Sequence, residues 1–292
     1  MADAEPLGEL DARFSSPGAS PTPIQPDSLA LPGQLTTAGS ALEGKVALVS
    51  GARQGIGAAI VRTFIAEGAQ VAALVRTPDQ TAAVEHSLAS AGICLCADVT
   101  DEAACRAAVR ECEERLGAID VLVNAAGIAV SAKFVDTDSD TWRRVIATDL
   151  DGPYHLTRSA LPAMLARGSG AVISIASTAG LNGAPYIAAY TAAKHGLVGL
   201  TRALAAEYAR SGVTFNCVCP AYVDTPMTER TIENIVKKTG RSREEALKAL
   251  LTSQPRLIAP EEVAAVCLML ASDAGRLING EAIIVDGGPL AR

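Results

Sequence analysis

Tyr190 and Lys194 are the pair of side chains in this sequence best placed to do chemistry, because residues four apart on a helix share one face. A phenol has a pKa of about 10 and is a weak base at neutral pH. A nearby ammonium favours the phenolate and brings general acid–base catalysis within reach. Ser177 ends an apolar run 13 residues before Tyr190, where it could hydrogen-bond a substrate oxygen. In isolation, such residues more often serve packing and capping, so their surroundings decide between the two interpretations.

A glycine-rich loop supplies those surroundings. The apolar run 46–50 leads directly into Gly51, Gly55 and Gly57, and a helical pattern follows. Glycines at such a turn let the backbone approach a pyrophosphate, which the N-terminus of the next helix stabilises. No Gly-Lys-Ser or Gly-Lys-Thr sequence follows, so a P-loop is excluded. The loop therefore predicts a dinucleotide site.

The elements that must position these residues alternate along the chain. Short apolar runs predict strands at about 46–50, 71–75, 93–97, 119–124, 171–176, 213–219 and 282–286. Amphipathic stretches predict helices at 55–67, 101–116, 141–166, 189–211 and 260–271. Most of the strands are apolar on both faces, as in a parallel sheet covered by helices on both sides. The pattern predicts an α/β fold, a single Rossmann-type doubly wound parallel sheet of about seven strands.

Two segments depart from this alternation. Residues 226–252 predict two short helices, with Pro226 at the start of the first, Gly240 at its end and a capping box at 242–245 for the second. They predict a small helical lid over the carboxyl edge of the sheet. Residues 1–43 hold six of the 15 prolines and show no periodicity. We expect them to be a flexible, disordered N-terminal tail, and 44–292 to be the dinucleotide-binding catalytic domain.

Composition excludes several other functions. A net charge of −7 argues against binding to nucleic acid, which needs Lys and Arg to neutralise phosphates. No apolar run reaches the roughly 18 residues of a membrane span, and the N-terminus has no secretory pattern, so we expect a cytoplasmic protein with no membrane contact. The seven cysteines and three histidines lack metal-ligand spacing, so we expect no metal site and buried, reduced thiols.

The glycine spacing G-x-x-x-G-x-G resembles that of the short-chain dehydrogenase/reductase family. The resemblance extends over about 44–289 and includes further motifs in the family's order. These are Asp98-Val99, Asn124-Ala125-Ala126-Gly127, Ser177 with Tyr190 and Lys194, and the segment from Pro220 to Pro226. It implies sheet order 3-2-1-4-5-6-7 and a homotetramer or homodimer that pairs through the helices at about 141–166 and 189–211.

The resemblance also implies an activity. The expected enzyme is an NAD(P)-dependent oxidoreductase that interconverts a ketone and a secondary alcohol by hydride transfer. Tyr190 would be the acid–base, Lys194 would lower the pKa of Tyr190 and bind the nicotinamide ribose, and Ser177 would orient the carbonyl. The lid resembles that of members acting on hydroxybutyrate and 3-oxoacyl substrates, which favours a 3-oxoacyl/3-hydroxyacyl substrate; polyketide-like and alicyclic ketones stay open. The alternative is a catalytically impaired cofactor-binding regulator or scaffold.

The family's cofactor contacts carry over to a defined set of residues. They are Gly51, Arg53, Gln54, Gly55, Ile56, Gly57, Arg76, Asp98, Val99, Asn124, Ala125, Gly127, Tyr190, Lys194, Pro220, Val223 and Thr225. An NAD enzyme places an acid at the end of the second strand, where this chain has Val75 followed by Arg76. A guanidinium can bind a 2′-phosphate, so the sequence favours NADP(H), with NAD(H) as the alternative.

Three features leave questions for the structure. Asp149 stands where the family usually has an asparagine that supports the lysine, which puts this fourth catalytic position in doubt. Ala221 replaces the glycine that usually follows Pro220, a change expected to have little effect. The lid cations Lys237, Lys238, Arg241 and Arg243 could contact the phosphates of a coenzyme A thioester, or form a solvated turn balanced by Glu244 and Glu245.

Overall fold

The computed structural model describes residues 40–88 and 90–287. The segment expected to be a tail therefore lies almost entirely outside the described residues. The described chain begins with a turn over residues 41–44, in which Leu42 is fully buried and its N–H donates to the Glu67 carbonyl at 2.8 Å. Packing of the described chain thus starts a few residues before Gly44.

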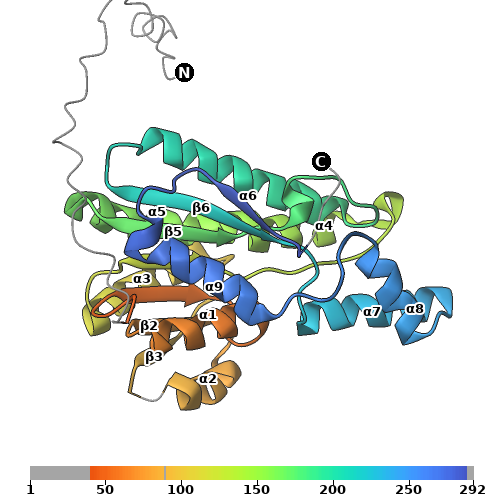
Figure 1. The fold of residues 1–292 in the computed structure, drawn as a ribbon, viewed down its shortest axis with the longest axis horizontal. Coiled ribbons are helices and arrows are strands. Elements are labelled where there is room, and N and C mark those ends of the chain that lie inside the picture. The colour runs from red at the N-terminus through yellow and green to blue at the C-terminus, as the bar shows by residue number, and fades with distance from the viewer. Residues whose placement is uncertain (1–39, 89, 288–292) are drawn as a thin grey trace, which may run out of the picture. The chain divides into compact units, whose positions relative to one another are not determined.

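A seven-stranded parallel sheet forms the centre of the described chain (Figure 1). Its strand order is β3-β2-β1-β4-β5-β6-β7, which confirms the predicted order and fold class. The strands are β1 Val46–Ser50, β2 Gln70–Val75, β3 Gly92–Cys96, β4 Val121–Asn124, β5 Gly170–Ile175, β6 Val213–Pro220 and β7 Ala282–Val285. The order reverses direction between β1 and β4, and ligands of such sheets bind beyond the carboxyl ends at this point.

Helices cover both faces of the sheet. They are α1 Gly55–Ala66, α2 Thr81–Leu88, α3 Glu102–Leu116, α4 Ser139–Ile146, α5 Gly152–Arg167, α6 Ala188–Glu207, α7 Pro226–Thr239, α8 Arg243–Leu250 and α9 Pro260–Ala271. In β1, Ala47 and Val49 pack into the core that α1 and α9 cover, whereas Val46 and Leu48 pack into the core under α3 and α5. Both faces of the strand are thus buried, which is why it is apolar at every position.

The predicted helix at 141–166 is wrong in one respect, because a π-helical turn at Ala147–Asp151 divides it into α4 and α5. Pro153 follows this turn in the first turn of α5. Proline has no N–H to donate to the carbonyl four residues earlier, so the regular α-helical hydrogen bond to the Asp149 carbonyl is missing at this point. The wider turn carries Asp149, which is buried.

Two further differences concern the region after β2 and the thiols. The sequence reasoning missed α2, a short helix of low amphipathicity; its signals were Pro78 before it and Val84 and Leu88 on its buried side. Cys96 is exposed, contrary to the expectation of buried thiols, because it lies at the end of the edge strand β3.

The lid is confirmed. α7 begins at Pro226 and ends at Gly240, which adopts the left-handed conformation of a helix C-cap. α8 begins with the predicted capping box, in which Ser242 and Glu245 each accept the other's backbone N–H. The two helices lie together at one end of the sheet (Figure 1) and share an apolar cluster centred on Ile232, Ala246 and Leu250.

Candidate active site

Ser177, Tyr190 and Lys194 meet where β5 ends and α6 begins. Ser177 follows β5, and its Oγ contacts Tyr190 through a hydrogen bond. Lys194, whose side chain is 4% exposed, lies with its Nζ 5.5 Å from the centre of the Tyr190 ring. The same Nζ donates a hydrogen bond of 2.9 Å to the Ile175 carbonyl, at the end of β5. The strand thus holds the lysine at a fixed point beside the phenol.

The pKa of Tyr190 reflects opposing influences. Burial raises it, while the Lys194 ammonium and the hydrogen bond with Ser177 lower it. The carboxylate of Asp149 also raises it, and the resulting pKa of Tyr190 lies above the ordinary value for tyrosine. The phenol is consequently protonated at neutral pH, the form that can donate a proton to a ketone oxygen.

Asp149 forms a buried ion pair with Lys194. Its side chain is 0% exposed, and its Oδ2 lies 3.2 Å from Lys194 Nζ. Its Oδ1 accepts the Ile128 N–H at 2.9 Å. Gly127 leaves the room for this arrangement, since a Cβ there would come within 3.0 Å of Oδ2. A carboxylate thus occupies the position where the family usually has a neutral amide.

The ion pair shifts the pKa of both partners. Burial raises the pKa of Asp149, and the Lys194 ammonium and the Ile128 N–H only partly oppose this. Burial lowers the pKa of Lys194, but the charges of Asp149 and Tyr190 outweigh burial and leave it raised. The lysine is therefore held as an ammonium, and the carboxylate reduces the positive field that reaches the phenol.

The glycine loop between β1 and α1 fits a pyrophosphate. Gly51 adopts φ +67°, and a Cβ there would lie 2.7 Å from the Ala126 backbone nitrogen. A Cβ at Gly57 would collide with the Gly51 carbonyl. The N-terminus of α1 has no side-chain cap at Gln54 and no acidic residue in its first turn. The backbone N–H groups at this helix end could therefore bind an anion.

Ser50 joins this loop to the turn after β4, a role that sequence reasoning missed. Its Oγ donates to the Val123 carbonyl at 3.3 Å and accepts the N–H groups of Ala125 and Ala126 at 3.1 and 3.3 Å. The only signal in the sequence was a polar residue at the end of an apolar strand. Ala125 and Gly127 are thereby held next to the glycine loop.

Asn124 lies buried beneath the same turn. Its Nδ2 donates to Thr157 Oγ1 at 3.2 Å and to Ser174 Oγ at 3.4 Å. Its Oδ1 has no hydrogen-bond partner among the described residues. A buried amide oxygen without a donor is uncommon, and it fits a site that a ligand completes.

The residues predicted for the adenosine half of a cofactor lie at the ends of β2 and β3. Val75 and Cys96 are paired in the sheet, so Arg76 and Asp98 follow neighbouring strand ends. Both of these side chains are exposed, and Asp98 Oδ1 accepts hydrogen bonds from the Thr100 N–H and hydroxyl. Val99 is buried. Arg53 and Gln54, in the glycine loop, bond to each other at 3.1 Å and are exposed.

The segment after β6 closes the other side of the site. The Pro220 carbonyl accepts the Ser177 hydroxyl at 3.5 Å, and Val223 is buried. Thr225 caps α7, and its methyl group leaves only 3.0 Å to a Cβ built at Gly55. The predicted cofactor residues of the glycine loop and of this segment are thus brought together, as are Ile56 and Val223 in one apolar core.

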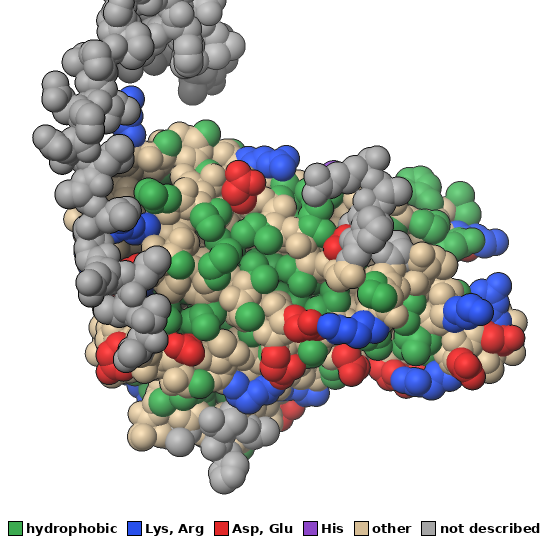
Figure 2. Space-filling model, in the orientation of Figure 1, with side chains coloured by type: hydrophobic (Ala, Val, Ile, Leu, Met, Phe, Trp, Pro, Cys, Tyr) green, Lys and Arg blue, Asp and Glu red, His purple; other side chains and the backbone are tan. Residues whose placement is uncertain are grey.

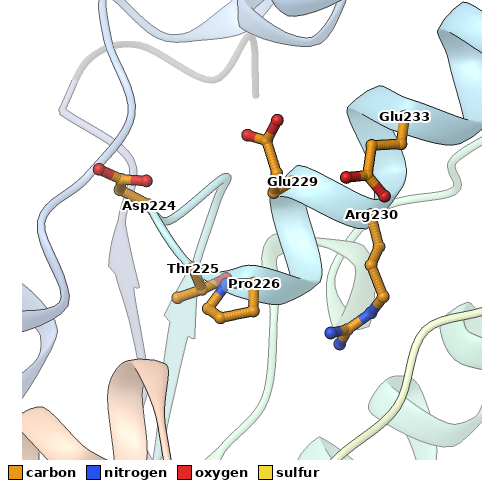
Figure 3. Close-up of a pocket in the computed structure, with 6 residues that line it drawn as sticks. All are labelled: Asp224, Thr225, Pro226, Glu229, Arg230 and Glu233. Carbon is orange, nitrogen blue, oxygen red and sulfur yellow. The ribbon is translucent and has the colours of Figure 1, made fainter.

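An open cavity of ≈ 530 Å³ lies where α7 begins (Figure 3). It is lined by Asp224, Thr225, Pro226, Glu229, Arg230 and Glu233. Figure 3 shows Arg230 pointing away from the carboxylates of Asp224 and Glu229. The cavity includes Thr225, whereas Ser177, Tyr190 and Lys194 do not line it. Its three acidic residues make it a poor site for phosphates.

The lid cations do not form a free cluster. Arg243 makes two hydrogen bonds to the Glu229 carboxylate, at 3.0 and 2.7 Å. Lys238 Nζ donates to the Ser131 carbonyl at 3.0 Å and so ties the lid to the loop after β4. Two of the four cations considered for coenzyme A phosphates are therefore already engaged within the chain.

Comparisons with known proteins identify the family. The family model described as enoyl-(acyl carrier protein) reductase matches residues 51–289. A D-beta-hydroxybutyrate dehydrogenase of Rhizobium meliloti (strain 1021) is 38% identical over 252 residues, covering 84% of this chain and 98% of the relative. A 3beta-hydroxysteroid dehydrogenase of Mediterraneibacter gnavus is 38% identical over 261 residues, covering 84% of this chain and 94% of the relative. A crystal structure of an actinorhodin polyketide ketoreductase variant with NADPH superposes on this chain with a TM-score of 0.80 at 36% identity. The match covers 83% of this chain and 96% of the ketoreductase chain.

This chain belongs to the short-chain dehydrogenase/reductase family. It is an NAD(P)-dependent oxidoreductase that interconverts a ketone and a secondary alcohol. The comparisons give no support to the alternative of an impaired regulator or scaffold. Within the part of the chain that the structure describes, no helix has the length and apolar character to cross a membrane, and no three potential ligand side chains gather for a metal ion.

Proposed function

We propose that this dehydrogenase/reductase works through Tyr190, Lys194 and Ser177, favours NADP(H) and acts on a 3-oxoacyl/3-hydroxyacyl-type substrate. The observation that carries the proposal is the buried Lys194 ammonium, 5.5 Å from the ring of a phenol that Ser177 also contacts. A nicotinamide cofactor bound at the glycine loop would supply or accept the hydride. The chain's own residues manage the proton and the substrate oxygen.

In ketone reduction, the hydroxyls of Ser177 and Tyr190 hydrogen-bond the carbonyl oxygen and stabilise the negative charge that develops on it. Tyr190 donates its proton to that oxygen as the alcohol forms. The Lys194 ammonium stabilises the resulting phenolate, and its bond to the Ile175 carbonyl keeps it in place. In alcohol oxidation the same groups act in reverse, so Tyr190 must first lose its proton.

Asp149 is proposed as a positioning residue rather than one that touches the substrate. It acts through Lys194, from which its Oδ2 is 3.2 Å distant. Its bond with the Ile128 N–H also fixes the turn after Gly127, where the cofactor is expected to pass. Its negative charge distinguishes it from an asparagine, and this difference makes its contribution measurable by pH.

The preference for NADP(H) rests on Arg76. Its guanidinium is exposed beyond β2, and no carboxylate stands at the strand end to accept the ribose hydroxyls of NAD(H). The remaining cofactor contacts proposed are those of the glycine loop, Asp98, Val99, Asn124 and the segment from Pro220 to Thr225. The uncapped α1 and the unpartnered Asn124 Oδ1 support a bound dinucleotide.

The proposed substrate class follows the relatives, among which are the hydroxybutyrate dehydrogenase and the polyketide ketoreductase. We also propose a cytoplasmic homotetramer or homodimer. Trp142 on α4 and Tyr154 on α5 expose apolar surface on one side. A second exposed apolar area lies over α9 and the half-buried edge strand β7, where Figure 2 shows apolar side chains gathered. Exposed apolar areas of this kind are typical of subunit contacts.

A panel of 3-oxo thioesters, 3-oxo esters and alicyclic ketones, each with NADPH and NADH, tests the proposal. We expect oxidation of NADPH at least tenfold more efficiently than NADH, with a 3-oxo thioester or ester as the best substrate. Equal or better use of NADH would contradict the cofactor assignment. Preference for an alicyclic ketone over every 3-oxo compound would contradict the substrate class.

A further inference from the structure

Tyr186 has an unusual backbone for its residue type. Its φ is +68°, and every other described residue with positive φ is a glycine. A side chain with a Cβ is disfavoured in this region because the Cβ crowds the following carbonyl oxygen. Residues kept in such conformations are concentrated at ligand sites and switch regions, so Tyr186 invites a functional explanation.

The position of Tyr186 places it beside the catalytic residues. It precedes α6 by two residues and Tyr190 by four. Its carbonyl accepts the Ala132 N–H at 2.9 Å, which joins the loop after β5 to the loop after β4. The neighbouring Ser131 carbonyl accepts Lys238 of the lid at 3.0 Å. Tyr186 therefore stands where three segments meet around the carboxyl edge of the sheet.

Two other exposed apolar side chains lie close to this junction along the chain. Tyr186 is 62% exposed, and Phe134 and Val135 are 72% and 86% exposed. All three lie within three residues of the hydrogen bond that joins the two loops.

Apolar side chains of the loop after β4 also surround the reacting groups. Ile128 and Val130, in the loop after β4, are partly buried and pack in one cluster with Tyr190. A substrate whose carbonyl reaches Tyr190 would thus have apolar side chains along the rest of its length. Ligand sites combine such walls with a few polar groups that fix orientation, as Ser177 and Tyr190 would here.

We propose that Tyr186 is a specificity-determining residue, which with Phe134 and Val135 binds the apolar body of a large ketone, a ring system or a long alkyl chain, at the mouth of the site. This inference rests on the proposed catalytic roles of Tyr190 and Ser177 and deepens the substrate assignment. The left-handed backbone presents the ring from a fixed direction. The enzyme consequently selects for bulky apolar ketones over small ones.

The test compares two ketones with the same reacting group, cyclohexanone and the bicyclic trans-1-decalone. For the wild type we expect a kcat/KM for the bicyclic ketone at least tenfold above that for cyclohexanone. Tyr186→Ala should lower this ratio about tenfold, as loss of partial burial of a ring predicts, through KM rather than kcat. Tyr186→Phe should keep the ratio, because it keeps the ring. Phe134→Ala should act in the same direction as Tyr186→Ala.

Two further variants separate binding from folding. Tyr186→Gly relieves the backbone and removes the ring, so it should lose selectivity like Tyr186→Ala while melting at a higher temperature than that variant. Leu277→Ala removes a side chain that is 88% exposed near the start of β7, at the opposite edge of the sheet, and should change nothing. A ratio that stays constant in Tyr186→Ala, or a wild type that does not prefer the bicyclic ketone, overturns the inference.

A wrong assignment of the catalytic residues would give a result distinct from a wrong assignment of Tyr186. If Tyr190→Phe retained turnover, the catalytic assignment would be wrong whatever the ratio. If the wild type reduced neither ketone, calorimetric binding of trans-1-decalone in the presence of cofactor would still decide the matter. Binding that weakens about tenfold in Tyr186→Ala supports the inference, and unchanged binding or none overturns it.

Discussion

Replacing Asp149 by asparagine should move the pH dependence of alcohol oxidation without harming ketone reduction. Asp149 is fully buried, and its Oδ2 lies 3.2 Å from the Lys194 ammonium. Burial raises the pKa of Asp149, and the Lys194 ammonium and the Ile128 N–H oppose that rise and favour the ionised form. Asparagine has nearly the same shape but no charge, so the variant removes the negative field while leaving an oxygen for the Ile128 N–H.

The size of the effect follows from the distances. Because Lys194 Nζ is 3.2 Å from Asp149 Oδ2 and 5.5 Å from the centre of the Tyr190 ring, the carboxylate is at most about 9 Å from that centre. At an effective dielectric constant of about 20, its repulsion of a phenolate charge at that distance is about 2 kcal/mol. That corresponds to roughly 1.4 pKa units. The negative charge of Asp149 is therefore one of the causes that raise the pKa of Tyr190.

Alcohol oxidation and ketone reduction need opposite protonation states of Tyr190, and this decides in which direction each pH profile shifts. Oxidation needs the deprotonated tyrosine, so the limb on which its kcat/KM rises with pH should move to lower pH by about 1.4 units in Asp149→Asn. Reduction needs the protonated tyrosine, which predominates at neutral pH in both forms, so its rate near pH 7 should change little. Profiles of both directions, measured with the same alcohol and ketone, provide the assay. A limb that stays in place or moves upward refutes the electrostatic reasoning and indicates a protonated Asp149.

Three further substitutions test separate parts of the site. Gly57→Ala should raise the Kd of the reduced cofactor at least about tenfold by fluorescence titration, since its Cβ would collide with the Gly51 carbonyl; Gly199→Ala, whose Cβ meets nothing, is the control. Arg76→Ala should weaken NADPH about tenfold or more but leave NADH within twofold, and equal losses would refute a 2′-phosphate contact. Lys238→Met should raise KM about two- to tenfold at constant kcat by releasing the lid from Ser131, whereas Lys237→Met should not; equal effects would refute the tie.

The fold was largely predictable because its signals are local. Buried parallel strands are apolar at every position, and caps such as Pro226, Gly240 and Ser242 mark where helices begin and end. The π-helical turn at Ala147–Asp151 was not predictable in this way, since the residues on both sides of it also form helices. The short helix α2 escaped because it is only eight residues long and weakly amphipathic.

The candidate site was predictable as far as motifs with fixed spacing define it. The order Ser177, Tyr190 and Lys194 appears in the sequence, but the distances among them depend on how β5 and α6 pack. The tie between Lys238 and Ser131 joins residues 107 positions apart, and no local pattern reveals it. The strained backbone of Tyr186 likewise depends on a bond to Ala132 in another loop.

The most direct test of the central claim is the rate of ketone reduction by Tyr190→Phe. This variant removes only the hydroxyl that donates the proton, and it keeps the ring beside Lys194. With the best ketone of the panel and NADPH, kcat should fall about 100- to 10,000-fold. The Kd of NADPH should rise far less than kcat falls, because the variant removes only the Tyr190 hydroxyl and keeps Lys194 and the glycine loop. A variant that keeps more than about a tenth of the wild-type kcat would show that Tyr190 is not the proton donor.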